Sequence, residues 1–428
     1  MGLMSGWGEQ HQLLMHQWVS LPFALMFYFL AKRGHLSLTN RYLFLSFGGC
    51  VLAVAAMGVY SLLLFTSAIV FALTVVRADP RHIHSWVFCI QMTWQTFWHL
   101  LMQYRKHRHH EPADIRLFTA VSSLMLLTQR MTSFSMDLQE ERVPSPPEAS
   151  PQNRGRDLLL PLSSYVLNFT TLLGGPLFSY DRFISLIKGI SVSPPPNPLG
   201  VVTLKVVQVS LLQWLRYCVV YFLTRHAADP ADFGVPVGTL WIWSLGVGFR
   251  LQYYSHWKIS ECLNNAAGLG FWAKSPADTP DWRMLSDGDL WTTEMSSRVS
   301  VFSRRWNATT AAWLRRLVFQ KFQTFPVLMT FGFSVWWHGL HLSQFVGFFT
   351  WAAAVHADYR IHRHVCPKLT STWRKTVYKC LSWINTQITI TFVVIAVESR
   401  DIPSLRLLFV TYLGPVFTTI LLFILLSF

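Results

Sequence analysis

Apolar runs of about 20 residues recur from one end of the chain to the other. The hydrocarbon core of a bilayer is about 30 Å thick, and roughly 20 consecutive apolar residues in a helix cross it. Each such run is therefore a candidate membrane span. Counting two or three of them as borderline, we predict roughly eleven spans. The runs lie near 13–31, 42–60, 61–77, 86–104, 116–135, 158–180, 201–224, 233–255, 322–343, 344–359, 377–397 and 403–427.

The predicted fold class is an all-α polytopic membrane protein. An unpaired backbone group in hydrocarbon is costly, so a spanning segment is either a helix or a strand of a closed barrel. None of the runs alternates apolar and polar residues with a period of two. The first run is followed by further spans rather than by a small-residue cleavage site, so we expect it to be retained. We interpret residues 1–428 as a single polytopic domain.

Polar segments punctuate this pattern. Residues 137–157 are Pro-rich and lack a hydrophobic period, which predicts a mobile surface loop. The prolines of 191–200 exclude a helix there, and 181–189 before them is typical of a short interfacial helix. Residues 256–321 form the longest polar and amphipathic region: 256–307 is rich in acidic residues and tryptophan, and 308–321 predicts an amphipathic helix at a headgroup surface.

Composition supports a membrane protein. Hydrophobic residues make up 52% of the chain and charged residues 13%, about half the usual charged fraction of a soluble domain. The net charge of +15 is explained more simply by basic loops against anionic lipid headgroups than by a nucleic-acid partner, which we do not expect. The six cysteines are scattered singly, which fits neither a disulfide framework nor a zinc site.

Histidine-rich 104-YRKHRHHEP-112 permits a metal site or a charged loop. The loop is favoured because the neighbouring Arg and Lys residues repel a cation.

The most unusual polar residue is His338, in 334-SVWWHGLHLSQF-345. An ionisable group inside a span is expensive and is a candidate for a functional site. The alternative is a histidine packed between helices with one satisfied hydrogen bond. His341, three residues on, would share a helical face with His338, but no third ligand stands at helical spacing, so we expect no metal.

A second polar residue, Asn307, lies 31 residues upstream in 302-FSRRWNATT-310. It starts a glycosylation sequon and also stands where the N-cap of the following helix is expected. Both interpretations stay open beside a catalytic one.

Together these residues carry a resemblance. A Trp-Asn pair before an amphipathic helix, followed about thirty residues later by Trp-His-Gly in a span, resembles the membrane-bound O-acyltransferase family and, within it, the peptide-acylating branch. The stretches that resemble it are 91-QMTWQT-96, 121-VSSLMLLTQRMTS-133, 252-QYYSHW-257, 300-SVFSRRWNATTAAWLRRLVFQ-320 and 333-FSVWWHGLH-341.

The resemblance implies an enzyme with helices around a central tunnel in the endoplasmic reticulum membrane. It would transfer a medium-chain acyl group, octanoyl, from acyl-CoA to a serine hydroxyl of a secreted peptide. His338 would act as general base, since imidazole titrates near neutrality, and Asn307 would orient substrate or stabilise the oxyanion. Octanoyl-CoA would be a substrate, and we expect no cofactor and no metal. The partners would be the peptide, the acyl-CoA and membrane lipid.

Further residues are candidates for binding substrate. Arg304 is the first choice for the nucleotide end of the donor, with Arg305, Arg315 and Arg316 as alternatives that would equally anchor a surface helix to headgroups. The remaining candidates stand beside the two polar residues or on the same predicted spans: Trp306, Phe331, Trp336, Trp337, His341 and Trp351.

Two other functions stay open. The first is acyl transfer to a lysophospholipid or another lipid, with the same catalytic pair. The second is a transporter in which a buried histidine relays protons; internal repeats would favour it, and the chain shows none.

Overall fold

The computed structural model describes residues 9–109, 114–140, 151–225, 235–272 and 281–399, with single short pieces between 403 and 412. The described residues are helical apart from turns and one isolated antiparallel bridge between Trp272 and Asp281, which confirms the all-α class. The elements are α1 (Glu9–Lys32), α2 (Leu38–Met57), η2 (Gly58–Tyr60), α3 (Ser61–Arg77), α4 (Ile83–His109), α5 (Ile115–Gln139), α6 (Pro151–Val166), α7 (Tyr180–Gly189), α8 (Leu199–Arg225), α9 (Val235–Ala266), α10 (Leu290–Glu294), α11 (Val299–Arg305), α12 (Ala308–Leu314), η4 (Arg315–Phe319), α13 (Pro326–His338), α14 (Leu342–Val365), η5 (Cys366–Lys368) and α15 (Thr372–Glu398).

The chain forms two compact units. We call residues 7–209 with 256–286 the N-terminal unit, and residues 210–255 with 287–428 the C-terminal unit. Helices α8 and α9 run from one unit into the other, so each contributes to both. The interpretation of the chain as one domain stays a prediction.

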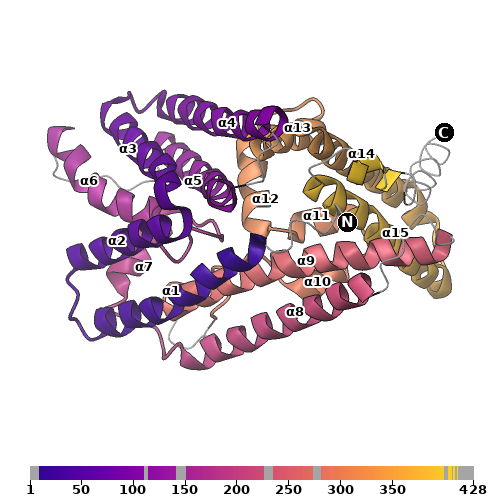
Figure 1. The fold of residues 1–428 in the computed structure, drawn as a ribbon, viewed down its shortest axis with the longest axis horizontal. Helices are drawn as coiled ribbons and strands as arrows, with labels where there is room; N and C mark the ends of the chain where they lie inside the picture. The colour runs from indigo at the N-terminus through magenta and orange to yellow at the C-terminus, as the bar shows by residue number, and fades with distance from the viewer. Residues whose placement is uncertain are drawn as a thin grey trace. The chain divides into compact units, whose positions relative to one another are not determined.

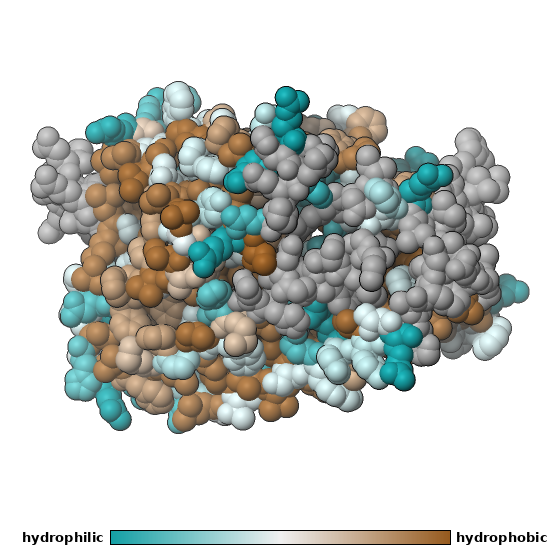
Figure 2. All heavy atoms as spheres, in the orientation of Figure 1, coloured by the Kyte–Doolittle hydropathy of each residue, from teal (hydrophilic) through white to brown (hydrophobic). Residues whose placement is uncertain are grey.

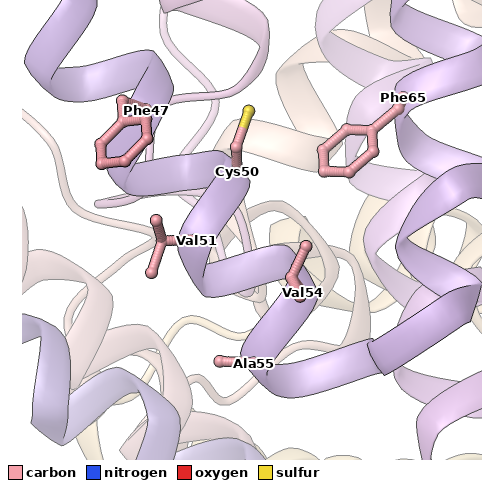
Figure 3. Close-up of a pocket in the computed structure, with 6 residues that line it drawn as sticks. All are labelled: Phe47, Cys50, Val51, Val54, Ala55 and Phe65. Carbon is pink, nitrogen blue, oxygen red and sulfur yellow. The ribbon is translucent and has the colours of Figure 1, made fainter.

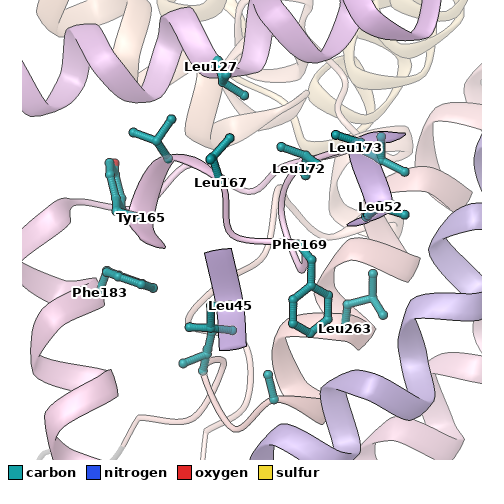
Figure 4. Close-up of a cluster of buried hydrophobic side chains, with 14 of the residues drawn as sticks. Leu45, Leu52, Leu127, Tyr165, Leu167, Phe169, Leu172, Leu173, Phe183 and Leu263 are labelled. Carbon is teal, nitrogen blue, oxygen red and sulfur yellow. The ribbon is translucent and has the colours of Figure 1, made fainter. Parts of the chain in front are cut away.

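The core of the N-terminal unit gathers around the segment that joins α6 to α7. Tyr165, Phe169 and Phe183 lie there among leucines of α2, α5 and α9, as Figure 4 shows. Tyr165 and Phe183 pack with ring centroids 5.6 Å apart. Gly49 on α2 allows the chain to approach closely, because a Cβ there would stand 1.6 Å from the carbonyl oxygen of Leu167.

The prediction of a span over 158–180 is wrong in its second half, because α6 ends at Val166. The side chain of Asn168 accepts hydrogen bonds from the Thr170 backbone and hydroxyl, both at 3.1 Å, and these local bonds replace the helix. Arg130 of α5 donates to the carbonyl of Val166 at 2.9 Å and to that of Thr171. Irregular backbone is tolerated here because it is buried and its carbonyls are paired.

Helices α2 and α3, with η2 between them, present an apolar outer surface. Side chains such as Phe47, Val59 and Ile69 are more than half exposed, and Figure 2 shows brown, hydrophobic residues over the area that these helices occupy in Figure 1. A soluble surface rarely exposes so large an apolar patch, whereas lipid covers it at no cost. This surface is what a membrane-embedded helix pair requires.

Among the described residues, four helical stretches are long and apolar enough to cross a membrane. They are Leu13–Lys32, Leu38–Arg77, Leu199–Arg225 and Thr372–Glu398. The predicted helices at 86–104, 116–135 and 233–255 are also present, as α4, α5 and α9. The count of roughly eleven spans stays a prediction, and most of the one near 403–427 lies outside the described residues.

The N-terminal unit carries a groove of about 550 Å³ on this outer surface (Figure 3). Its lining comes from α2 and α3, with Cys50 between Phe47 and Phe65. Cys50 is the one titratable side chain among these lining residues, and no histidine or carboxylate stands with it there to act as a base.

The polar loop expected at 137–157 is shorter than predicted. Helix α5 continues to Gln139 and α6 begins at Pro151, while 141–150 lie outside the described residues. The short helix expected at 181–189 is confirmed as α7, and the next helix begins at Leu199 after the prolines. The polar region expected from residue 256 begins inside a helix, because α9 extends to Ala266.

In the C-terminal unit, α14 packs against α13, α15 and α11. Figure 1 shows α13 and α14 as consecutive helices with α11 and α12 beside them. The predicted span 322–343 is wrong in its bounds, because α13 covers only Pro326–His338. Helix α13 begins with Pro326 at its first position, where a proline loses no helical hydrogen bond.

Candidate active site

His338 is the last residue of α13. The chain leaves the helix through Gly339, with φ 110°, and Leu340, with φ 63°. The Leu340 amide donates to the carbonyl of Val335 at 3.1 Å, and the Gly339 amide to the same carbonyl at 3.2 Å. Such a left-handed ending favours glycine and satisfies the last carbonyls of the helix. His338 therefore stands at a helix end, and not in the middle of a continuous span.

His341 does not share a helical face with His338, contrary to expectation. It is the N-cap of α14 and forms a capping box: its side chain accepts from the Gln344 amide, and its own amide donates to the Gln344 side chain at 3.2 Å. The two histidines are separated by the left-handed residues Gly339 and Leu340. Within the described part of the chain, no group of three or more His, Cys, Asp or Glu residues is placed to hold a metal ion.

The half-buried imidazole of His338 lies among aromatic rings. The ring centroid of Trp337 is 4.8 Å from that of His338, and the ring centroid of Phe348 is 5.0 Å from it. Phe348 is parallel to Trp351 at 6.4 Å, and Phe331 packs on Trp351 at 5.5 Å. Three of the residues named from the sequence, Phe331, Trp337 and Trp351, therefore belong to the aromatic cluster around His338.

Asn307 occupies a left-handed turn between α11 and α12. Its φ is 45° and its ψ is 60°, a conformation that asparagine tolerates better than most residues. It stands at the N-cap position of α12, as expected, but its side chain makes no capping hydrogen bond. The half-buried amide is thus not committed to the helix that follows it.

Helix α11, which ends just before Asn307, is fixed to α14 by polar contacts. Trp351 donates through Nε1 to the hydroxyl of Ser303 at 2.6 Å. Arg298, the N-cap of α11, donates to both carboxylate oxygens of Asp358 at 3.1 to 3.2 Å, and the pair is largely buried. The Ser300 amide also donates to Asp358, at 3.3 Å.

A second set of contacts joins the segment after Asn307 to α13. Trp313 of α12 packs on Trp337 with centroids 5.2 Å apart and on Phe333 at 5.8 Å. The π-helical turn η4 also packs against α13. Such turns occur often at functional sites. The elements that carry Asn307 and His338 therefore pack together on two sides, through α14 and through Trp313.

Trp306 belongs to a different cluster. It stacks on Phe302 at 5.6 Å and contacts the rings of Tyr253 and Tyr254 edge-on, at 5.5 and 5.4 Å. The Tyr254 hydroxyl donates to the Glu294 carboxylate at 2.7 Å.

Glu294 also accepts from the guanidinium of Arg250, at 3.0 Å. Arg250 is 2% exposed and donates further to Thr391 and Gln387 of α15. A buried charge needs such complete pairing. This network holds α9, α10 and α15 together beneath Trp306.

The remaining candidates lie at the edge of the site. Arg304 is exposed and donates to the hydroxyl of Tyr359 at 2.9 Å. Arg305 donates to the Thr292 carbonyl and to the Ser296 hydroxyl. Trp336 is half-buried and packs edge-on against Phe333.

Sequence reasoning missed Phe348, Ser303, Asp358, Arg250 and Glu294. A weak signal existed for two of them, because Arg250 and Asp358 are charged residues in otherwise apolar runs.

Comparison with known proteins identifies the family. The sequence profile of the MBOAT, membrane-bound O-acyltransferase family matches residues 59–396, well over half of the chain. The chain belongs to the membrane-bound O-acyltransferase family. As a member of this family it is a multi-pass membrane acyltransferase, which sets aside the transporter alternative.

Several family members are similar over most of their length. Membrane-bound ghrelin O-acyltransferase MBOAT4 from Rattus norvegicus is 39% identical over 425 residues, covering 97% of this chain and 96% of that protein. The Mus musculus protein of the same name is also 39% identical, over 426 residues with the same coverage. Membrane-bound glycerophospholipid O-acyltransferase 1 from Homo sapiens is 26% identical over 428 residues, covering 91% of this chain and 84% of that protein.

Proposed function

We propose that this acyltransferase transfers an octanoyl group from octanoyl-CoA to a serine hydroxyl of the ghrelin or proghrelin peptide. The observation that carries the proposal is the 39% identity over nearly the whole length of two proteins named for ghrelin O-acylation. The similarity to a glycerophospholipid O-acyltransferase is lower, at 26%, and makes lipid acylation the second candidate.

In this mechanism His338 is the general base. A serine hydroxyl is a weak nucleophile at neutral pH, and a positioned imidazole that accepts its proton accelerates attack. The serine Oγ bonds to the thioester carbonyl carbon while its proton passes to a nitrogen of His338. The aromatic surroundings of His338, from Trp337 and Phe348, support this role because they exclude competing water.

Asn307 acts on the charge that develops. Attack places a negative charge on the former carbonyl oxygen, and the amide N–H of Asn307 donates to it or orients the serine. Collapse of the intermediate breaks the carbon–sulfur bond. The proton on His338 then passes to the departing sulfur, so the products are a serine ester, free CoA thiol and a neutral imidazole.

The acyl chain would occupy the aromatic surface next to His338. Phe331 and Trp351 pack on each other there, and the hydrogen bond from Trp351 to Ser303 restrains the indole. Trp336 and Trp337 would extend this wall. Trp306 would line the approach beside Asn307, and His341, at the start of α14, would stand near the entrance.

The anionic CoA moiety would bind at the exposed end of α11 through Arg304. Because acyl-CoA is cytosolic and a secreted peptide is lumenal, the site would open to both sides of the endoplasmic reticulum membrane through a tunnel. Octanoyl-CoA is consumed as a substrate, and the reaction as written needs no metal and no cofactor.

The acceptor is tested by offering each candidate in a separate reaction. Purified enzyme in detergent is given labelled octanoyl-CoA with the ghrelin peptide, with the same peptide carrying alanine in place of its acceptor serine, or with a lysophospholipid. The proposal predicts an ester on the serine-containing peptide alone. Label on the lysophospholipid, with none on the peptide, would replace this proposal with the second candidate.

A further inference from the structure

The left-handed turn at Asn307 needs support from its surroundings. A left-handed conformation is unfavourable for an L-residue, and it persists where neighbouring structure determines it. Asn307 takes φ 45° and ψ 60° without a capping bond from its own side chain. What holds the turn must therefore come from another segment.

That segment begins with Asp287, which is 3% exposed. Its backbone carbonyl accepts a hydrogen bond from the Ala308 amide at 2.9 Å. Its carboxylate accepts one from the hydroxyl of Thr309. Asp287 thus accepts hydrogen bonds from both residues that follow Asn307, Ala308 and Thr309.

Gly288, in the same segment, lies against the backbone of Arg305, two residues before Asn307. Its φ is 133°, and a Cβ at this residue would stand 2.7 Å from the carbonyl oxygen of Arg305. Only glycine allows that approach. Residues 287–288 therefore contact the chain on both sides of Asn307, at Arg305, Ala308 and Thr309.

We propose that Asp287 is a positioning residue that orients the Asn307 amide for the acyl-transfer step. The inference rests on the proposed roles of Asn307 and His338, and it adds a residue that touches neither substrate nor the reacting atoms. Displacing a catalytic group by about 1 Å can cost a hundredfold in rate. Loosening the turn should consequently lower kcat and leave acceptor binding unchanged.

The first test compares Asp287→Ala with Asp287→Asn. The alanine variant removes the acceptor for the Thr309 hydroxyl, and we expect kcat to fall about ten- to a hundredfold with the KM for the peptide unchanged. The asparagine variant keeps a side-chain oxygen at that place and should recover most of kcat. Asp289→Ala is the matched control, because its carboxylate caps α10 through the Thr292 amide, so kcat should hold.

The second test changes the other partner. Thr309→Val should reproduce the kcat of Asp287→Ala, Thr309→Ser should retain the wild-type value, and the Asp287→Ala and Thr309→Val losses should not add. These variants also serve where Asp287→Ala does not fold. Wild-type kcat in Asp287→Ala or Thr309→Val, losses that add in full, or a change confined to KM would each overturn the inference.

Different variants test the proposed acceptor, the role of the Asn307 amide and the positioning role of Asp287. A wild-type enzyme that acylates no peptide refutes the proposed acceptor, and a fully active Asn307→Gly variant refutes the role of the amide. An active wild type that loses activity in Asn307→Gly and keeps it in both Asp287→Ala and Thr309→Val refutes only the positioning role of Asp287.

Discussion

Both candidate catalytic residues, Asn307 and His338, stand in or beside left-handed backbone. Among the described residues, the non-glycine positions with positive φ are Asn307, Phe325 and Leu340. One is the candidate amide donor itself, and Leu340 lies two residues after His338. Because such positions cost free energy, their location at a proposed site is itself an indication of function.

Replacing Asn307 with glycine removes the side-chain amide and keeps the left-handed backbone, so the variant tests the amide alone. Glycine adopts the left-handed conformation without strain. The free energy of unfolding of the variant should therefore lie within about 1 kcal/mol of the wild-type value. If the amide stabilises the oxyanion, kcat should fall about 10²- to 10³-fold. Thermal unfolding in detergent and peptide octanoylation measure the two quantities.

Phe325→Gly is the matched control, since Phe325 has φ 53° and is 70% exposed. It makes the same backbone change outside the site and should leave kcat intact. An Asn307→Gly enzyme with wild-type kcat would exclude the amide from the chemistry.

At the scale of single residues, the sequence already singles out the two candidate catalytic side chains. His338 and Asn307 stand out because each is polar in a Trp-rich setting. The sequence does not indicate their backbone conformations, because an asparagine before a helix predicts a cap, and the capping bond is missing here. The residues that follow Asn307 instead bond to Asp287, twenty positions earlier, and no local pattern shows that contact.

At the scale of elements, the apolar pattern conceals the end of α13. The predicted span 322–343 runs across Gly339, because the residues on both sides of this glycine are mostly apolar. A single glycine in an apolar run is an ambiguous signal, tolerated within spans as well as at helix ends. The break becomes visible only through the bonds of Gly339 and Leu340 to Val335.

Helix α14 acts as a common support for the site. It contacts His338 through Phe348 and holds α11 through Asp358 and Trp351. None of these pairings can be read from the sequence, because Arg298 and Asp358 are sixty positions apart. The proposed catalytic residues stand in short sequence motifs, whereas this support comes from long-range packing.

Removing the Asp358 carboxylate should test that support. Asp358→Ala leaves the largely buried Arg298 guanidinium without its partner, which should cost about 3 kcal/mol of unfolding free energy. The double variant Arg298→Met with Asp358→Asn removes the charge and keeps an acceptor for the Ser300 amide, so it should regain much of that stability. A single variant as stable as the wild type in detergent melts would contradict the role given to this pair.

At the scale of the whole molecule, the sequence predicts an all-helical membrane protein, and the apolar surface of α2 and α3 agrees with it. The exact number of spans is harder to read, since helices such as α4 and α5 carry buried polar residues that lower their hydropathy. Gln91, Gln95 and Gln129 are among them, each at most 2% exposed. Composition cannot distinguish such an interior polar face from a solvated one.

A lysine on the lipid-facing surface tests the membrane assignment. Ile69 lies within the Leu38–Arg77 stretch and is 61% exposed, so Ile69→Lys should cost about 2.5–3.5 kcal/mol of insertion free energy. The fraction of protein that resists alkaline extraction from membranes should fall. Val192→Lys, at an 86% exposed position between α7 and α8, should insert normally; equal extraction of the two variants would show that Ile69 does not face lipid.

Peptide octanoylation by His338→Ala tests the general-base role most directly. We expect kcat to fall by about 10²- to 10⁴-fold in an enzyme that melts like the wild type, because the hydroxyl loses its proton acceptor. His356→Ala, an exposed histidine on α14, should retain full activity under the same conditions. A His338→Ala enzyme that forms the serine ester at the wild-type rate would contradict the mechanism.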